Sequence, residues 1–229
     1  MHFEQGHIYH IFNQGNNRDR IFFKRENYLF FLRKMRTHIL PFGDILAYCL
    51  MPNHFHIMMV VNETEMLFTR SATQIHTPSR SFYSECDLKS RPELESTQIH
   101  APSKMQKTNI NKEIGILLAS YTRAINKEQK LSGSLFRQKT KAECLTCNKG
   151  ITPSFFNTNY GTKINIPRQE KQYPQACFDY IHHNPVKAGL VKRAIDWEFS
   201  SYRDYCGKRN GTLINKNATK EFGIIYDLE

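Results

Sequence analysis

The chain has 229 residues, of which 40% are hydrophobic, and a formal net charge of +11. This length suits one domain with a core of ordinary size, and no apolar run approaches the roughly 20 residues that a membrane span requires. No basic segment followed by a hydrophobic one opens the chain, so we expect no secretory signal. The six cysteines are scattered, and we interpret them as reduced thiols of a cytoplasmic protein.

The first 61 residues predict three strands and one helix. Aromatic and β-branched residues are typical of strands, and apolar residues at spacings of three and four are typical of a helix. We expect a strand over residues 7–13, a helix over 25–40, and strands over 44–51 and 54–61, the last two joined by Pro52-Asn53. The last strand is apolar on both faces beyond its first residues, which predicts a central place in its sheet.

The composition changes after residue 61. Residues 62–110 are polar and rich in Ser, Thr and Pro, and they contain a near-repeat, Thr73–Arg80 and Thr97–Lys104. We interpret this segment as a flexible or loosely packed insertion. Residues 146–172 are also irregular and indicate a second insertion or a long loop. Both segments interrupt what we interpret as a single domain over residues 1–229.

Two helices are predicted in the second half of the chain. One spans residues 111–130, and the other begins near Tyr173, with Pro185 either stopping it or falling in its last turn. Residues 197–205 are expected to pack back on the core, and one more strand is considered around residues 223–226. This order of elements predicts an α+β fold, a ferredoxin-like antiparallel sheet with helices packed mainly on one face.

The positive charge is concentrated in residues 104–149, which contain ten Lys and Arg and three Asp and Glu. Residues 134–142 alternate as a strand, and three of these cations share one side of it. Such a row suits a nucleic-acid backbone, because neutralised phosphates release counterions; a solvated edge strand is the alternative. The candidate DNA-binding residues, drawn from this row, a polar loop and two helices, are Arg18, Arg123, Arg137, Lys139, Lys141 and Lys187.

A pair of histidines opens the apolar strand. His54 and His56 are two residues apart, so in a strand their side chains project from the same face. Two imidazoles on a rigid strand are suited to bind a metal ion, although hydrogen-bonded structural histidines have the same spacing. Cys144 and Cys147 also have a metal-like spacing, but no second pair of this kind accompanies them, so a zinc site is a minor alternative.

Two sequence blocks resemble a known family. The first is Pro-Asn-His-Phe-His at 52–56, followed by the apolar strand; the second is Tyr-Ile-His-His-Asn-Pro-Val-Lys-Ala-Gly-Leu-Val at 180–191. In this order they resemble the REP-associated tyrosine transposases, which belong to the single-tyrosine branch of the HUH nucleases. Shorter segments that agree with the resemblance are residues 12–18, 120–126 and 197–202.

The resemblance implies a metal-dependent transposase or endonuclease that acts on single-stranded DNA containing a hairpin. A divalent ion, Mg²⁺ or Mn²⁺, would be held by His54, His56 and one amide or acidic ligand and would polarise the cleaved phosphate. A tyrosine hydroxyl would attack the phosphorus and leave a 5′-phosphotyrosine and a free 3′-OH, which allows rejoining without ATP. The protein would be a monomer or a homodimer. A non-catalytic nucleic-acid-binding regulator on the same fold is the alternative.

Two tyrosines are candidates for the nucleophile. Tyr180 is followed four residues later by Asn184, one helical turn away on the same face, so both could approach one metal ion. Tyr121 has no ligand at that spacing and is the alternative nucleophile. Pro185 disfavours a helical conformation at the residue before it, so His183 stays open as an alternative ligand.

Overall fold

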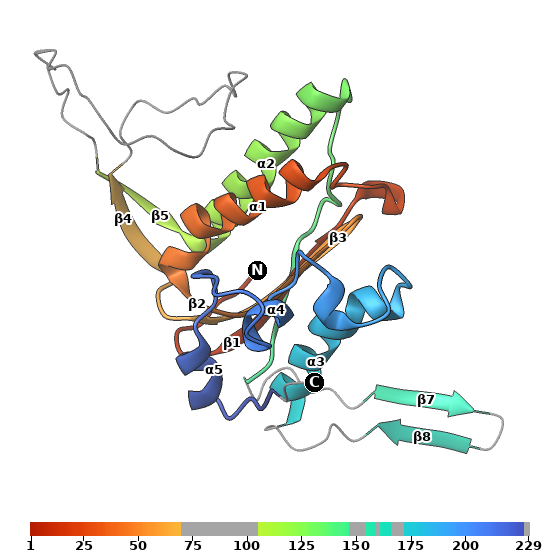
Figure 1. Cartoon of the computed structure of the whole chain (residues 1–229). Helices are drawn as coiled ribbons and strands as arrows, with labels where there is room; N and C mark the ends of the chain where they lie inside the picture. The colour runs from red at the N-terminus through yellow and green to blue at the C-terminus, as the bar shows by residue number, and fades with distance from the viewer. Residues whose placement is uncertain (70–104, 147–153, 159–160, 166–171, 227–229) are drawn as a thin grey trace, which may run out of the picture.

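The computed structural model describes residues 1–69, 105–146, 154–158, 161–165 and 172–226. One antiparallel sheet has the strand order β2-β3-β1-β6. Its strands are β1 (Ile8–Gln14), β2 (Gly43–Met51), β3 (His54–Val61) and β6 (Lys141–Cys144). With helix α1 (Arg25–His38) between β1 and β2, and helix α2 (Ile110–Gln129) before β6, the connection is ferredoxin-like. The predicted α+β class is therefore confirmed, and β3 lies inside the sheet as expected (Figure 1).

Both faces of the sheet are covered by helices. Because side chains alternate along a strand, Phe55 and Ile57 of β3 pack into the cluster formed with α1 and α2, whereas Met58 and Val60 pack on the opposite side. Helices α1 and α2 lie side by side on one face, as expected. On the other face lie α3 (Gln172–Lys187), α4 (Tyr202–Tyr205) and α5 (Lys216–Glu221), so the prediction of helices mainly on one face holds only for the first two.

The two predicted insertions contain ordered pairs of strands at the described positions. Strand β4 (Glu65–Thr69) pairs with β5 (Met105–Asn109), and β7 (Ser154–Thr158) pairs with β8 (Gly161–Asn165), both antiparallel (Figure 1). The prediction of irregular chain over residues 146–172 is therefore wrong for β7 and β8, whereas β4 and β5 are paired strands within the predicted insertion over 62–110. The near-repeat lies outside the described residues.

The predicted strand over residues 134–142 is wrong for most of its length. Only the part from Lys141 onwards belongs to β6, and Phe136 forms an isolated bridge with Gly15. Between them, the side-chain amide of Asn13 donates to the carbonyl oxygen of Arg137 at 3.1 Å and to Thr140 Oγ1 at 2.9 Å. Apart from the backbone bond from the N–H of Arg137 to the carbonyl oxygen of Gln14, at 2.9 Å, a side chain of β1 therefore takes the place of the ladder between Arg137 and Thr140.

The C-terminal predictions have mixed outcomes. Helix α3 continues through Pro185 to Lys187, so this proline falls in the last turn, one of the two predicted cases. Residues 223–226 are not a strand: Gly223 has a φ of 68° after the end of α5, and Ile225 is bound instead by the side chain of Gln175.

The segment after α3 packs back on the sheet as predicted. The backbone N–H of Leu50 donates to the carbonyl oxygen of Phe199 at 2.9 Å, so this segment extends the pairing at the β2 edge. Ser201 Oγ accepts from the backbone N–H of Tyr48 at 2.9 Å and lies 2.7 Å from His182 Nε2. Ser201 therefore ties α3 to strand β2, which places the helix over the sheet.

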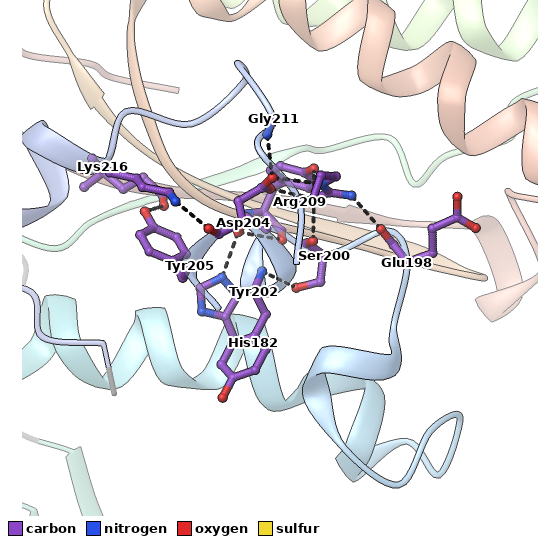
Figure 2. A network of polar contacts seen from close by, with 12 residues as sticks. His182, Glu198, Ser200, Tyr202, Asp204, Tyr205, Arg209, Gly211 and Lys216 are labelled. Atoms are coloured by element: carbon purple, nitrogen blue, oxygen red, sulfur yellow. Dashed lines mark hydrogen bonds and ion pairs between the residues drawn. The ribbon is translucent and has the colours of Figure 1, made fainter. Parts of the chain in front are cut away.

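An ion pair that we call the clasp, Asp204 with Arg209, holds this segment (Figure 2). Two guanidinium nitrogens of Arg209 donate to the buried carboxylate at 2.6 and 2.8 Å, and the backbone N–H of Gly211 donates to it at 2.9 Å. Arg209 also donates to the carbonyl oxygens of Glu198 and Ser200. The clasp thus joins the segment that follows α3 to the loop before α5.

Within the described residues, no helix is long and apolar enough to cross a membrane. Cys49, Cys177 and Cys206 are free thiols, whereas Cys144 is disulfide-bonded, so the prediction of reduced cysteines is wrong there. A disulfide sulfur is no zinc ligand, and Cys147 lies outside the described residues. The structure therefore gives no support to the zinc alternative.

Candidate active site

The two strand histidines open β3 on the sheet face that α3 covers. His54 pairs with Gln14 of β1 and His56 pairs with Phe12, and the two imidazole centroids lie 5.0 Å apart. Their shared face follows from the period of two along a strand. The rings are nearly perpendicular, at 84°, so they are not stacked on each other.

Helix α3 brings two polar side chains to these histidines. Asn184 is 8% exposed, and its Nδ2 lies 3.0 Å from His56 Nε2. One turn earlier, the ring of Tyr180 lies 5.4 Å from the ring of His56 and is 42% exposed. The ammonium group of Lys187 lies 5.4 Å from the Tyr180 ring centroid. A tyrosine open to solvent thus stands beside a buried histidine–amide cluster.

Two residues of this cluster were missed by the sequence reasoning. His10 of β1 has its Nε2 2.9 Å from His56 Nδ1, and the two rings are stacked with centroids 5.0 Å apart. Asn53 has its Oδ1 2.6 Å from His54 Nδ1. His10 was assigned only to a strand, and Asn53 was placed in a turn and in the first sequence block without a role of its own. Alternation within residues 7–13 could have placed His10 on one face, but the register with β3 was needed to bring it to His56.

With the side-chain amides of Asn53 and Asn184 placed as in the structure, the hydrogen bonds are satisfied by one set of proton positions on the two histidines. The amide oxygen of Asn53 can only accept, so His54 donates from Nδ1 and its Nε2 carries a lone pair. The Nδ2 of Asn184 can only donate, so His56 Nε2 accepts and Nδ1 donates to His10. Both histidines therefore keep Nε2 unprotonated, as a metal ligand requires.

Burial keeps these imidazoles neutral. It lowers the pKa of His10 to about 4 and lowers the pKa of His56 well below its ordinary value, to which the neighbouring His10 also contributes. The pKa of His54 is also lowered, mainly by burial. Neutral rings are what a cation needs, since a protonated imidazole has no free lone pair.

The donor set is two imidazole nitrogens and one amide. Among the described residues, no group of three or more His, Cys, Asp and Glu is arranged to hold a metal ion, so the third protein ligand in this cluster would be the amide. Rotating the Asn184 amide by half a turn exchanges its nitrogen and oxygen, which would present Oδ1 beside the two Nε2 atoms. A mixed nitrogen and oxygen set fits a divalent ion such as Mn²⁺, and Mg²⁺ less well because it prefers oxygen.

The alternative residues lie elsewhere. Tyr121 is 0% exposed in the core on the α1 and α2 side, and its hydroxyl donates to the carbonyl oxygen of Ile21 at 2.9 Å. Burial raises the pKa of this hydroxyl, which disfavours the phenolate. His183 is exposed, and its Nδ1 lies 2.9 Å from the carbonyl oxygen of Asp179 on its own helix. Tyr121 therefore lies on the sheet face opposite the histidine cluster, and the hydrogen bond of His183 is to its own helix.

The predicted DNA-binding cations fall into three groups. Lys187 lies beside Tyr180, and Lys141 of β6 has its ammonium group 5.7 Å from the ring of Phe12, next to the cluster. Arg18 has a left-handed φ of 63° in the loop after β1, and its carbonyl oxygen accepts from the Asn53 amide that orients His54. The remaining three are exposed at other positions, Arg137 and Lys139 in the irregular segment and Arg123 on α2.

The fold and the cluster together define an α+β protein with a ferredoxin-like sheet that carries a histidine–amide–tyrosine centre. Neither the protein-family models nor the curated proteins give a match to the sequence. A solved structure of a REP-associated tyrosine transposase bound to a REP hairpin is similar to this chain, with a TM-score of 0.46 and 16% sequence identity. The similarity covers 100% of this chain and 91% of that one. At this level it carries no argument about function.

Proposed function

We propose that the protein is a metal-dependent endonuclease and strand transferase for single-stranded DNA, of the kind that the two sequence blocks resemble. Tyr180 is the nucleophile, and His54, His56 and Asn184 are the ligands of a divalent ion. The observation that carries the proposal is that these four side chains, from β3 and α3, meet in one cluster with Tyr180 open to solvent. The hairpin-containing substrate and a cytoplasmic location rest on the sequence resemblance and composition alone.

The chain's own residues account for most of the reaction. The Tyr180 oxygen forms a bond to the phosphorus, the bond from phosphorus to the 3′ oxygen breaks, and the phenolic proton is lost while the leaving oxygen gains one. The products are a 5′-phosphotyrosine and a free 3′-OH, and the reverse step with another 3′-OH rejoins the strand. Lys187, beside the Tyr180 ring, supplies positive charge for the phosphate. A bound divalent ion would supply further stabilisation of phosphate charge.

The decisive experiment is capture of the covalent adduct. The full-length protein is incubated with Mn²⁺ and a pool of labelled single strands that contain hairpins, and the protein–DNA adduct is separated by denaturing electrophoresis. We expect an adduct with the natural chain and none with Tyr180→Phe, which should still bind DNA nearly normally. The control is Tyr173→Phe on the same helix, because Tyr173 is similarly exposed, at 47%. Adduct at the natural level from Tyr180→Phe would overturn the assignment.

Changes to the histidines test the metal part of the proposal. Replacing His54 or His56 by Ala removes a nitrogen ligand and should abolish cleavage, with at most partial rescue by excess Mn²⁺. A regulator without catalysis is the competing function, favoured because the described residues contain no group of three or more His, Cys, Asp and Glu arranged to hold a metal ion. That function predicts hairpin binding by the natural chain with no adduct and no cleavage at any Mn²⁺ concentration.

A further inference from the structure

Phe12 occupies an unusual place in the sheet. It lies on β1 opposite His56, yet among the described residues it belongs to neither hydrophobic cluster. Its side chain is half-buried, whereas its neighbours Ile11 and Asn13 are buried. A large aromatic ring left partly open on a sheet face is informative, because core packing does not account for it.

The surroundings of this ring are polar and basic. Phe12 stacks beside His10, with ring centroids 4.7 Å apart at 27°, and lies 5.9 Å from the ring of His56. Its partner on β6 is Lys141, whose ammonium group lies 5.7 Å from the ring centroid. Lys141 is exposed. An aromatic surface and a mobile cation therefore adjoin the histidine cluster on the sheet.

A second pair of the same kind stands on the helix side. The Tyr180 ring has the ammonium group of Lys187 at 5.4 Å, so an aromatic ring and a cation flank the histidines from α3 as well as from β1 and β6. On β6, the exposed Glu143 pairs with His10, and its negative charge disfavours a phosphate there. A phosphate is therefore favoured two residues away, at Lys141. Aromatic rings interleaved with cations are the means by which proteins bind single strands, since every base has a face to stack.

We propose that Phe12 and Lys141 form a nucleobase-stacking subsite. An unpaired base that flanks the cleaved phosphodiester lies on the Phe12 ring, and its phosphate is neutralised by Lys141. This inference rests on the proposed function and adds to it a residue that selects unpaired over paired DNA, because a base inside a duplex cannot offer its face to the ring. The ligand class is a single-stranded nucleotide of any base.

Binding without cleavage tests the subsite. The probes are strands made of a hairpin with oligo(dT) flanks that carry 2-aminopurine at successive flank positions, used without divalent ions. With the natural chain we expect quenching at one flank position, where the base stacks on Phe12. Phe12→Leu keeps an apolar side chain but should lose that quenching and bind about tenfold more weakly, whereas Phe12→Trp should keep both. Lys141→Gln should lower the slope of log affinity against log salt by about 0.7.

The matched control is Phe30→Leu. Phe30 of α1 is also partly buried and has the ammonium group of Lys34 5.4 Å from its ring, but it packs on the other side of the sheet. We expect this variant to bind and quench like the natural chain, with thermal unfolding of all variants measured alongside. Natural affinity and quenching in Phe12→Leu would overturn the subsite and leave the proposed function intact. No hairpin-strand binding by the natural chain would overturn both.

Discussion

Removing the guanidinium of the clasp should strongly destabilise the fold. In Arg209→Met, the Asp204 carboxylate, whose side chain is 2% exposed, loses both charged hydrogen bonds and keeps only the backbone N–H of Gly211. Leaving one partner of a buried ion pair without its counter-charge costs about 3–5 kcal/mol. Because the Arg209 side chain is 30% exposed, we expect the lower end, about 3 kcal/mol. For a domain of this size that corresponds to a fall in Tm of about 6–12 °C.

Urea and thermal unfolding followed by circular dichroism measure this loss. The control is Arg193→Met, because Arg193 makes a similar two-bond pair with Asp196, at 2.9 and 3.1 Å, but both side chains are exposed. Solvent screens such a pair, so its removal should leave the midpoint unchanged. The double variant Arg209→Met with Asp204→Asn should lose less stability than the two single variants added together, since it leaves no buried charge without a partner. Equal midpoints for the two Arg variants would refute the reasoning.

The remaining predictions concern the site and the loop beside it. The variant His10→Phe keeps an aromatic ring but removes the nitrogen that accepts the hydrogen bond from His56. The affinity for Mn²⁺, measured by titration calorimetry, should fall about 10- to 100-fold. An unchanged affinity would remove His10 from the site. In Gly15→Ala the added Cβ would lie 2.2 Å from the carbonyl oxygen of Asp19, which forces the loop to shift. We expect a loss of about 1–3 kcal/mol in urea unfolding, and a variant as stable as the natural chain would contradict this close approach.

The main sheet and its two long helices could be predicted because each has a local signal. The helices α1 and α2 have apolar side chains at spacings of three and four, and β3 is apolar on both faces, as a strand inside a sheet covered on both sides must be. The segments that form the pairs β4 with β5 and β7 with β8 have no such hydrophobic period, so their pairing could not be predicted from the sequence. The break before β6 depends on the side chain of Asn13, more than a hundred residues away in the chain.

The candidate site divides in the same way. His54 with His56 and Tyr180 with Asn184 were paired by the local periods of a strand and a helix, so each pair could be named without knowing the fold. His10 could not, because it reaches His56 only through the register of β1 with β3. A residue that contacts such a side chain only through the tertiary structure has no characteristic spacing from it in the sequence.

The end of α3 is where the local rules conflict. Proline disfavours a helical conformation at the residue before it, yet Asn184 is helical, and its carbonyl oxygen accepts from the N–H of Ala188 at 2.9 Å. The free-energy cost of this helical conformation at Asn184 is limited because Pro185 falls in the last turn. The side chain of Asn184 is also held by its hydrogen bond with His56. Since Tyr180 and Asn184 lie on this one continuous helix, any shift of α3 against the sheet moves both together. The distance from Tyr180 to the histidines is therefore set by how α3 packs on β2, to which the hydrogen bonds of Ser201 with His182 and Tyr48 contribute.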